Sequence, residues 1–258
     1  MDPLEAFTAF EGRLLRRLST RVVPFAWGTA YLDDDLPQRY YSNFLRTETD
    51  LTRVSADDLI AAADEILGDD RFEHRLVIVR DEVAAERLSP GFATAGFGRA
   101  PEVVQLLRRE PDRPRALDVD VVPFSEARDL ILQTYLEDEQ LPNEVAVPFT
   151  DIRAKYESAV GARFFVARID GEQAGLCELY VDGEDAQIEN VGTILQFRNR
   201  GVARSVVLAA CETARAAGAI RIWVLADEQD WPQHLYERLG FDRLAIDVGF
   251  LRSPATTS

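Results

Sequence analysis

Three β-type segments between residues 163 and 193 constrain the fold more than any other feature of this sequence. Asp170-Gly171 and Asp182-Gly183 separate these segments, and such pairs are typical of tight hairpin turns. A glycine-containing turn follows, and residues 203–218 then repeat apolar side chains at i, i+3, i+4 and i+7, which is the spacing of one helix face. The chain is therefore predicted to form an antiparallel meander whose last strand leads directly into a helix.

Helices and strands alternate on both sides of this meander. We expect Ser125 to be the N-cap of the helix before it, and Gly161 to end a second helix. The resulting order, β-α-α-β-β-β-α-β-α-β, predicts an α/β (α+β) fold. The flanking elements are expected at residues 118–124 (strand), 125–136 and 150–160 (helices), 219–227 (strand), 231–241 (helix) and 242–252 (strand).

A change of composition at residues 108–117 predicts a linker, because two prolines and alternating charges interrupt the apolar pattern there. We therefore expect two domains, residues 1–112 and 113–258. In the first domain, the end of a predicted helix aligns without gaps to residues 236–241, so that Phe92 falls at Tyr236. No glycine turn precedes the other helix of this domain, so we interpret the first domain as a degenerate repeat of the second.

The net charge of −16 argues against nucleic acid as a partner, because affinity for nucleic acid comes largely from lysine and arginine. No run of about 18 apolar residues is present, so no membrane span is expected. The first residues are acidic and show helical spacing, which predicts no export signal. We expect a cytoplasmic protein that is a monomer or a homodimer, and the scarcity of lysine suggests a GC-rich bacterial genome.

The sequence contains two cysteines and two histidines. Cys177 and Cys211 lie far apart and lack ligand-like spacing, which is typical of buried thiols in a reducing compartment. Two histidines cannot form an ordinary histidine metal site. We therefore expect no bound metal.

The turn before the helix reads Arg-Asn-Arg-Gly-Val-Ala, residues 198–203. The first N–H groups of a helix have no intrahelical partner and its N-terminus carries about half a positive charge, so amides that converge there are suited to phosphate. Gly201 has no Cβ and allows a ligand to approach the main chain closely. The alternative for this stretch is an arginine-rich solvated loop.

Two motifs in this order resemble those of the GNAT superfamily of acetyl-CoA-dependent N-acetyltransferases. The turn of that family reads Gln/Arg-x-x-Gly-x-Gly/Ala, which residues 198–203 satisfy. Its later helix often ends Tyr-Glu-Lys-Leu-Gly-Phe, and residues 236–241 differ only by arginine for lysine. The resemblance covers residues 118–252 and implies a mixed central sheet flanked by helices, in tandem with a degenerate N-terminal GNAT-like domain as in some bacterial members.

The resemblance also implies that acetyl-CoA is the co-substrate. In the family, amides of the turn hold the CoA pyrophosphate, and amides of the preceding splayed strand pair with the pantetheine arm and the thioester oxygen. Leu195 stands where many members have proline, and Gln229 stands where many have asparagine. The implied cofactor-binding residues are Thr193, Ile194, Leu195, Arg198, Asn199, Arg200, Gly201, Val202, Ala203, Arg204 and Gln229.

Two residues match the family's catalytic positions. Tyr236 stands where the family's acid usually lies, and a phenol with a pKa near 10 can protonate a thiolate with a pKa of about 8.5 at little cost. The alternative is a core tyrosine. Glu189, on the splayed strand, is a candidate base that acts through water as in some members, and the alternative is a structural role.

The acceptor site is expected beside an acidic stretch, residues 131–150, which contains no lysine or arginine. In GNAT folds the first two helices usually form one wall of this site, and a wall of one charge attracts ligands of the other. We expect Glu137, Asp138 and Glu139 to bind the substrate there, unless the stretch is ordinary acidic surface. The expected function is transfer of acetyl from acetyl-CoA to a primary amine of a cationic small molecule or peptide. The alternative is a non-catalytic acyl-CoA-binding sensor or scaffold.

Overall fold

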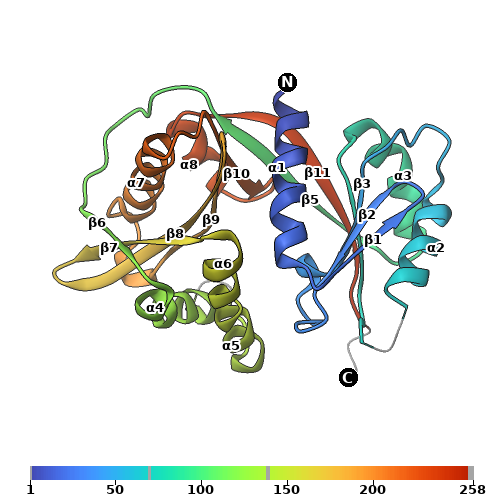
Figure 1. Cartoon of the computed structure of the whole chain (residues 1–258), viewed down its shortest axis with the longest axis horizontal. Helices are drawn as coiled ribbons and strands as arrows, with labels where there is room; N and C mark the ends of the chain where they lie inside the picture. The colour runs from blue at the N-terminus through green and yellow to red at the C-terminus, as the bar shows by residue number, and fades with distance from the viewer. Residues whose placement is uncertain (1, 69–70, 138–139, 255–258) are drawn as a thin grey trace. The chain divides into compact units, whose positions relative to one another are not determined.

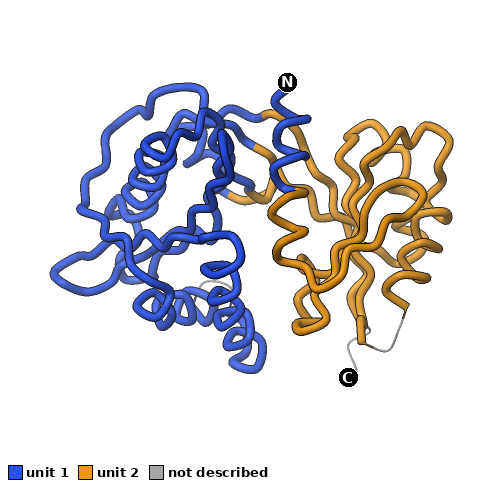
Figure 2. Tube along the Cα trace, in the orientation of Figure 1, with its two compact units in different colours: residues 1–11, 105–225, 231–243 blue, residues 12–104, 226–230, 244–258 orange. Residues whose placement is uncertain are grey.

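The computed structural model describes residues 2–68, 71–137 and 140–254 and has a mixed α/β fold, in which helices flank a mixed sheet (Figure 1). The chain divides into two compact units (Figure 2). Unit 1 contains residues 1–11, 105–225 and 231–243, and unit 2 contains residues 12–104, 226–230 and 244–258.

Both units are discontinuous in sequence, and four elements contribute residues to each of them. These elements are α1 (Pro3–Leu18), β5 (Gly98–Leu107), β10 (Arg221–Asp227) and β11 (Phe241–Arg252). The division into domains at residues 112 and 113 stays a prediction.

The predicted meander is present in unit 1. Three antiparallel pairings join its first four strands, and the last strand of the meander pairs in parallel with the strand that follows the next helix. Asp170, Gly171 and Gly183 have φ values of 51°, 87° and 64°, which close the two hairpins. The strands are β6 (Val119–Val122), β7 (Arg163–Ile169), β8 (Glu172–Asp182), β9 (Asp185–Thr193) and β10 (Arg221–Asp227).

The helices of unit 1 differ from the sequence expectation in two places. Ser125 lies inside the first helix instead of capping it, because the Glu157 carboxylate from another helix accepts a hydrogen bond from the Phe124 N–H at 2.9 Å. The helix expected at residues 150–160 is present over Arg153–Val160, and a separate helix that contains Pro148 precedes it. The helices are α4 (Phe124–Glu137), α5 (Asn143–Asp151), α6 (Arg153–Val160), α7 (Val202–Ala216) and α8 (Pro232–Arg238).

Two of these helices cover opposite faces of the meander. A Cβ at Gly175 would lie 2.6 Å from Val202 of α7, whereas a Cβ at Gly192 would lie 2.8 Å from Thr134 of α4. Gly175 pairs with Thr193, the neighbour of Gly192, and successive residues of a strand face opposite sides. Helix α7 therefore packs on one face and α4 on the other, on the two sides of β8 in Figure 1.

Unit 2 repeats part of this pattern. Its strands follow the order β1-β2-β3-β4-β11, in which β3 and β4 are parallel and the other pairs are antiparallel. Ile246, Val248 and Phe250 of β11 are buried in the same core as the helices of this unit. The elements are β1 (Arg21–Phe25), β2 (Gly28–Leu32), β3 (Phe44–Thr47), β4 (Arg75–Val79), α2 (Ala56–Ile66) and α3 (Glu82–Thr94).

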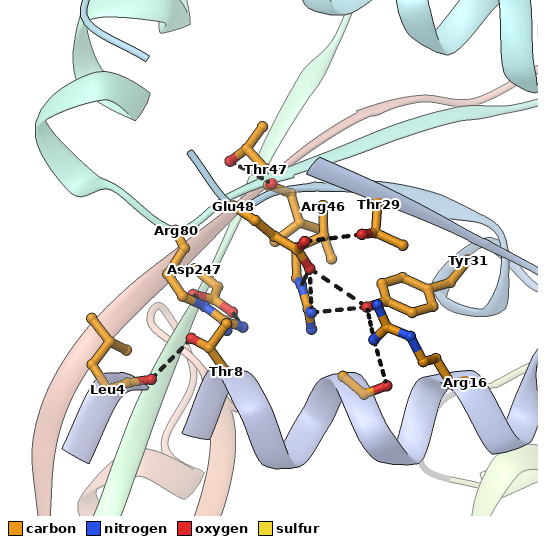
Figure 3. A network of polar contacts seen from close by, with 12 residues as sticks. Leu4, Thr8, Arg16, Thr29, Tyr31, Arg46, Thr47, Glu48, Arg80 and Asp247 are labelled. Atoms are coloured by element: carbon orange, nitrogen blue, oxygen red, sulfur yellow. Dashed lines mark hydrogen bonds and ion pairs between the residues drawn. The ribbon is translucent and has the colours of Figure 1, made fainter. Parts of the chain in front are cut away.

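A buried arginine organises the polar side chains of unit 2 (Figure 3). Arg46 of β3 is 2% exposed, donates to the Tyr31 hydroxyl at 2.9 Å and forms an ion pair with Glu48 at 2.6 Å. Glu48 also accepts from Thr29 Oγ1 at 2.9 Å. Burial raises the pKa of the Glu48 carboxyl, but the hydrogen bond and charge of Arg46 outweigh burial, so that this pKa lies below its ordinary value.

Candidate active site

Helix α7 begins at a backbone turn that no side chain caps. Its N-cap, Gly201, is left-handed with φ 82° and ψ 12°, and Asn199 two residues earlier is also left-handed with φ 62°. The first intrahelical bond at this end runs from Ser205 N–H to Gly201 O at 3.0 Å. The N–H groups before Ser205 have no partner inside the helix, so this end of α7 presents donors for an anion.

The space beside Gly201 is open. A Cβ built on this residue would meet only the Ala116 Cβ, at 3.9 Å. Any residue other than glycine would be strained here because of the positive φ, and its side chain would occupy the space next to the amides. The turn therefore leaves room for an anion beside the amides, and its binding of phosphate stays a prediction.

The three arginines of the turn lie in different environments. Arg204 is buried, and its guanidinium binds the Asp112 carboxylate at 2.5 Å and the Arg113 carbonyl at 3.0 Å. Arg200 is half-exposed and lies 3.8 Å from Asp170, and Arg198 is exposed. The side chain of Arg204 therefore holds the linker, and only its backbone N–H remains a candidate for phosphate.

Strand β9 stops pairing with its parallel neighbour, β10, about halfway along β9. The ladder between β9 and β10 ends at the pair Ile188–Val224. On the other side of β9 the register to β8 shifts between Glu178–Glu189 and Leu176–Gly192, so that two residues of β9 oppose one residue of β8. A bulge of this kind bends the strand, and it lies where the resemblance implies a splay.

The backbone N–H groups after the bulge differ in whether they already donate a hydrogen bond within the protein. The Ile194 N–H donates to Ala174 O at 3.0 Å, so this N–H is not available to a ligand. Thr193 pairs with Gly175 without exchanging hydrogen bonds, so its own N–H points to the side of β9 that β10 has left. The Leu195 N–H donates weakly to the Glu137 carboxylate at 3.4 Å.

Glu189 of β9 and Tyr236 of α8 are both surrounded by protein atoms, and the charge of Glu189 acts on Tyr236. Glu189 keeps some exposed surface, but protein atoms surround its carboxyl, and this burial raises its pKa to about 6. Tyr236 is 5% exposed, and burial, followed by the charges of Glu189 and Cys177, raises its pKa well above that of a free phenol. The low proton-transfer cost expected for Tyr236 therefore needs revision, because a buried phenol is harder to ionise.

A glycine fixes the end of helix α8 that carries Tyr236. Gly240 has φ 98°, and a Cβ there would lie 2.1 Å from the Arg109 carbonyl oxygen. That backbone approaches closely because the Arg108 and Arg109 N–H groups both donate to Gly240 O. The glycine of the Leu-Gly-Phe motif is therefore required by contact with the segment after β5.

The acidic acceptor residues are described only in part. Glu137 ends α4, and its carboxylate accepts from Gln133 Nε2 at 2.7 Å as well as from Leu195. Asp138 and Glu139 lie outside the described residues. Gln229 lies in the exposed turn after β10, in unit 2, and its role stays a prediction.

A buried polar cluster beside Glu189 was missed by the sequence analysis. Its centre is Glu178, which is fully buried on β8 and binds Tyr180, Asn190 and Arg153. The signal in the sequence was a single charged residue in the apolar run 174–181. Charged residues are almost never fully buried unless they are paired, so this one required a partner.

Unit 2 contains the corresponding elements without these features. Its helix α2 is closed by a capping box between Ser55 and Asp58, in which each side chain accepts from the other residue's N–H. Phe92 packs edge-to-face on Phe97 with ring centroids 5.2 Å apart, as Tyr236 packs on Phe241 at 6.0 Å. The aligned helices thus make the same ring contact, but α2 has a capped N-terminus and position 92 carries no phenol.

The described residues contain no helix that is long and apolar enough to cross a membrane. Within the same part of the chain, no three His, Cys, Asp or Glu side chains lie together as a metal site would require.

Comparisons with known proteins agree with this geometry. The model of the acetyltransferase (GNAT) family matches residues 126–241. A GCN5-related N-acetyltransferase from Kribbella flavida is 14% identical, with a TM-score of 0.68 over 100% of this chain and 98% of that chain. A conserved protein of unknown function from Staphylococcus epidermidis ATCC 12228 is 15% identical, with a TM-score of 0.69 over 92% of this chain and 95% of that chain.

A tandem GNAT protein from the clavulanic acid biosynthesis pathway is 18% identical, with a TM-score of 0.55 over 78% of this chain and 70% of that chain. At these identities the three structures show a shared fold. No curated protein matches the sequence. The family match supports acyl transfer from an acyl-CoA. Residues 126–241 therefore match the acetyltransferase (GNAT) family, and the chain shares its fold with solved GNAT proteins.

Proposed function

We propose that this protein transfers the acetyl group of acetyl-CoA to a primary amine of a cationic small molecule or peptide. The observation that carries the proposal is that unit 1 combines an uncapped helix N-terminus at Gly201 with two enclosed titratable groups, Glu189 and Tyr236, of which the first raises the pKa of the second. A helix end suited to phosphate would account for the binding of CoA, and a base and an acid would account for the transfer. Both cysteines are buried free thiols, which supports a reducing, cytoplasmic location.

The backbone of the turn would hold the co-substrate. The N–H groups of residues 199–204 are proposed to bind the pyrophosphate, and the exposed Arg198 and Arg200 would add charge. The Thr193 N–H would donate to the pantetheine arm or to the thioester oxygen, where it stabilises developing negative charge. The Leu195 N–H can join it once Glu137 releases its weak hydrogen bond.

Glu189 and Tyr236 are proposed to move the two protons of the reaction. Glu189 accepts a proton from the amine, through a water molecule, so that the nitrogen lone pair can form the new C–N bond. Tyr236 donates its proton to the sulfur as the C–S bond breaks, and the phenolate recovers, through solvent, the second proton that the nitrogen loses once the C–N bond has formed. An ammonium ion and a thioester thus give an amide, a thiol and one proton, which Glu189 passes to solvent.

The interaction between these two residues favours one order of transfer. The negative charge of Glu189 raises the pKa of Tyr236, so that this phenol stays protonated while Glu189 is ionised. Once Glu189 has taken the proton of the amine its charge is gone, and Tyr236 becomes easier to ionise. The base therefore acts before the acid.

A cationic acceptor is supported by the position of Glu137. This carboxylate lies beside the N–H of Leu195, at the end of the splayed part of β9. A carboxylate there would attract an ammonium group toward the thioester, and a chain with a net charge of −16 would favour the approach of cations.

The test is release of CoA thiol from acetyl-CoA on addition of polyamines, aminoglycosides and lysine-containing peptides, followed with a thiol reagent. The thiols of the protein are buried, so the folded enzyme gives little background. Thiol release that depends on an amine is expected. Tight binding of acetyl-CoA in calorimetry with no release for any amine would instead support a sensor, and no binding at all would reject both functions.

A further inference from the structure

The bulge in β9 occurs at an asparagine in an uncommon conformation. Asn190 has φ 51°, and residues other than glycine adopt this region rarely, although asparagine tolerates it best. It follows Glu189 directly and lies two residues after the last pairing with β10. The conformation of Asn190 therefore determines both the direction of Glu189 and the point at which β9 bends.

Glu178 anchors this residue from the neighbouring strand. Its Oε1 accepts from Asn190 Nδ2 at 2.8 Å, and its Oε2 accepts from the Tyr180 hydroxyl at 2.5 Å. Glu178 has no exposed surface. A buried carboxylate is costly unless it is paired. The anchor therefore depends on a cation.

Arg153 of α6 supplies that cation. Its Nη1 lies 3.2 Å from Glu178 Oε2, and its Nη2 donates to the Tyr135 hydroxyl at 2.7 Å. The guanidinium also lies over the Tyr156 ring, 4.8 Å from the centroid. Arg153 is 6% exposed, and its Nε has no hydrogen-bond partner among the described residues. The side chain is thus enclosed by the residues that hold it beside Glu178.

The two charges act on Glu189 in opposite directions. The positive charge of Arg153 lowers the pKa of Glu189, whereas the negative charge of Glu178 raises it, in addition to the larger effect of burial. The other titratable or polar groups that act on Glu189 or respond to its charge come from four elements: Gln187 on β9, Tyr180 on β8, Glu11 on α1 and Tyr236 on α8.

We propose that Glu178 and Arg153 are positioning residues for Glu189, because together they anchor the bulge at Asn190 and place opposite charges beside the Glu189 carboxyl. The inference rests on the proposed role of Glu189 as the base. Through Arg153, helix α6 would then influence the reaction carried out by Glu189 on β9. A purely structural cluster would stabilise the fold but would leave the protonation of Glu189 unchanged.

Variants of the two charges give results of opposite sign. Glu178→Gln removes a negative charge and should lower the titration midpoint of the Glu189 carboxyl by about 1 pH unit. Arg153→Met removes a positive charge and should raise that midpoint by a similar amount. The double variant Glu178→Gln/Arg153→Met leaves no unpaired buried charge and should restore a midpoint near that of the wild type. Arg153→Lys keeps the charge and should stay close to the wild type.

The midpoint is measured in two independent ways. In the full chain, ¹³C-carboxyl NMR of labelled glutamates reports the titration directly, with Glu189→Gln to assign the signal. The acidic limb of kcat/KM reports the same group during turnover. Circular dichroism shows which variants fold, and if one single variant does not, the direction of the shift in the other still tests the pair.

A separate variant tests the anchor itself. Asn190→Gly keeps the left-handed backbone accessible but removes the hydrogen bond to Glu178. The expected result is a kcat lowered at least about tenfold with a smaller change in the affinity for acetyl-CoA, because the turn at Gly201 is not altered. The inference is overturned if Asn190→Gly has wild-type kcat, or if both single charge variants leave the NMR midpoint unchanged or shift it in the same direction. Absence of thiol release from the wild type with every amine would reject the proposed function alone, since the NMR titration would still test the pair.

Discussion

Tyr236 and Glu189 are both buried titratable groups, and burial disfavours the charged form of each. For Tyr236 this raises the cost of giving up the proton, which loss of the charge on Glu189 during the reaction would reduce. For Glu189 it brings the pKa to about 6, close to the range in which a base works efficiently. At neutral pH Glu189 is thus mostly ionised and Tyr236 is protonated.

Replacement of Tyr236 by phenylalanine removes the proton while retaining the ring contact with Phe241. General acid catalysis typically contributes about 10²–10⁴-fold, so we expect kcat to fall within that range while KM for acetyl-CoA changes little. Steady-state kinetics measure both. Tyr41→Phe, at an exposed position of unit 2, is the control and should be unaffected. A Tyr236→Phe enzyme with wild-type kcat would make Tyr236 a core residue.

The rate should depend on pH through Glu189. A base must be unprotonated, so kcat/KM is expected to be constant above its pKa and to fall tenfold per unit as pH drops below about 6. The pH profile of the wild type measures this limb, and Glu189→Gln should abolish it and lower the plateau. If Glu189→Gln retains the same limb at the same rate, another group is the base.

The acceptor proposal makes Glu137 a determinant of affinity for cations. Glu137→Gln should raise KM for a polyamine or aminoglycoside and reduce its dependence on salt, because one attractive charge beside Leu195 is lost. Asp129→Asn, on the same helix but 93% exposed, is the matched control. Equal effects of the two variants would mean that only the net charge of the protein matters, and no effect of either would make the acidic stretch ordinary surface.

At the scale of elements, the two comparable helix N-termini of this chain have opposite chemistry. Helix α7 begins at Gly201 with no side-chain cap, whereas α2 is closed by Ser55 and Asp58 and has acidic residues in its first turn. An N-terminus that is already capped and carries negative charge cannot accept phosphate. The difference between the units is therefore set by the few residues around each cap.

Gly201→Val should abolish binding at this end of α7. The side chain would occupy the space beside the amides, and we expect the affinity for acetyl-CoA to fall by more than about tenfold, equivalent to about 1.4 kcal/mol. Gly183→Val is the matched control, because Gly183 also has a positive φ and an unobstructed Cβ direction but lies in a hairpin. Calorimetry measures affinity, and urea unfolding measures the stability lost through strain. Equal affinities in the two variants would place the phosphate elsewhere.

At the scale of the whole molecule, strand β11 determines whether the N-terminal part of the chain can fold without the C-terminal part. Its residues Val248–Arg252 pair with Arg75–Val79 of β4, and Phe250 stacks on Phe92 with ring centroids 4.1 Å apart. The ion pair between Arg80 and Asp247 continues this connection (Figure 3). All of these contacts lie within unit 2, although β11 comes from the end of the sequence.

A fragment of residues 1–112 should therefore fail to fold. It lacks three buried side chains of the core, at residues 246, 248 and 250, each worth about 1.5–3 kcal/mol, against a typical total stability of about 5–15 kcal/mol. Fusion of residues 244–254 to the fragment through a flexible linker should restore a cooperative unfolding transition, and the folded product should not bind acetyl-CoA. A stable fragment without β11 would show that unit 2 does not need this strand.

The sequence by itself determined the local features of this protein. The hairpin glycines, the apolar spacing of α7, the Ser55 cap and the turn at Gly201 are all set by residues within a few positions of one another, and the structure contains each of them. The tertiary structure decided the rest. Glu157 caps α4 from 33 residues away, Arg204 binds Asp112 from 92, and Arg80 meets Asp247 from 167. Glu178 likewise became an anchor only because folding placed Arg153 and Asn190 beside it. Such partners depend on which elements the topology brings together, and a local pattern of residues does not encode that arrangement.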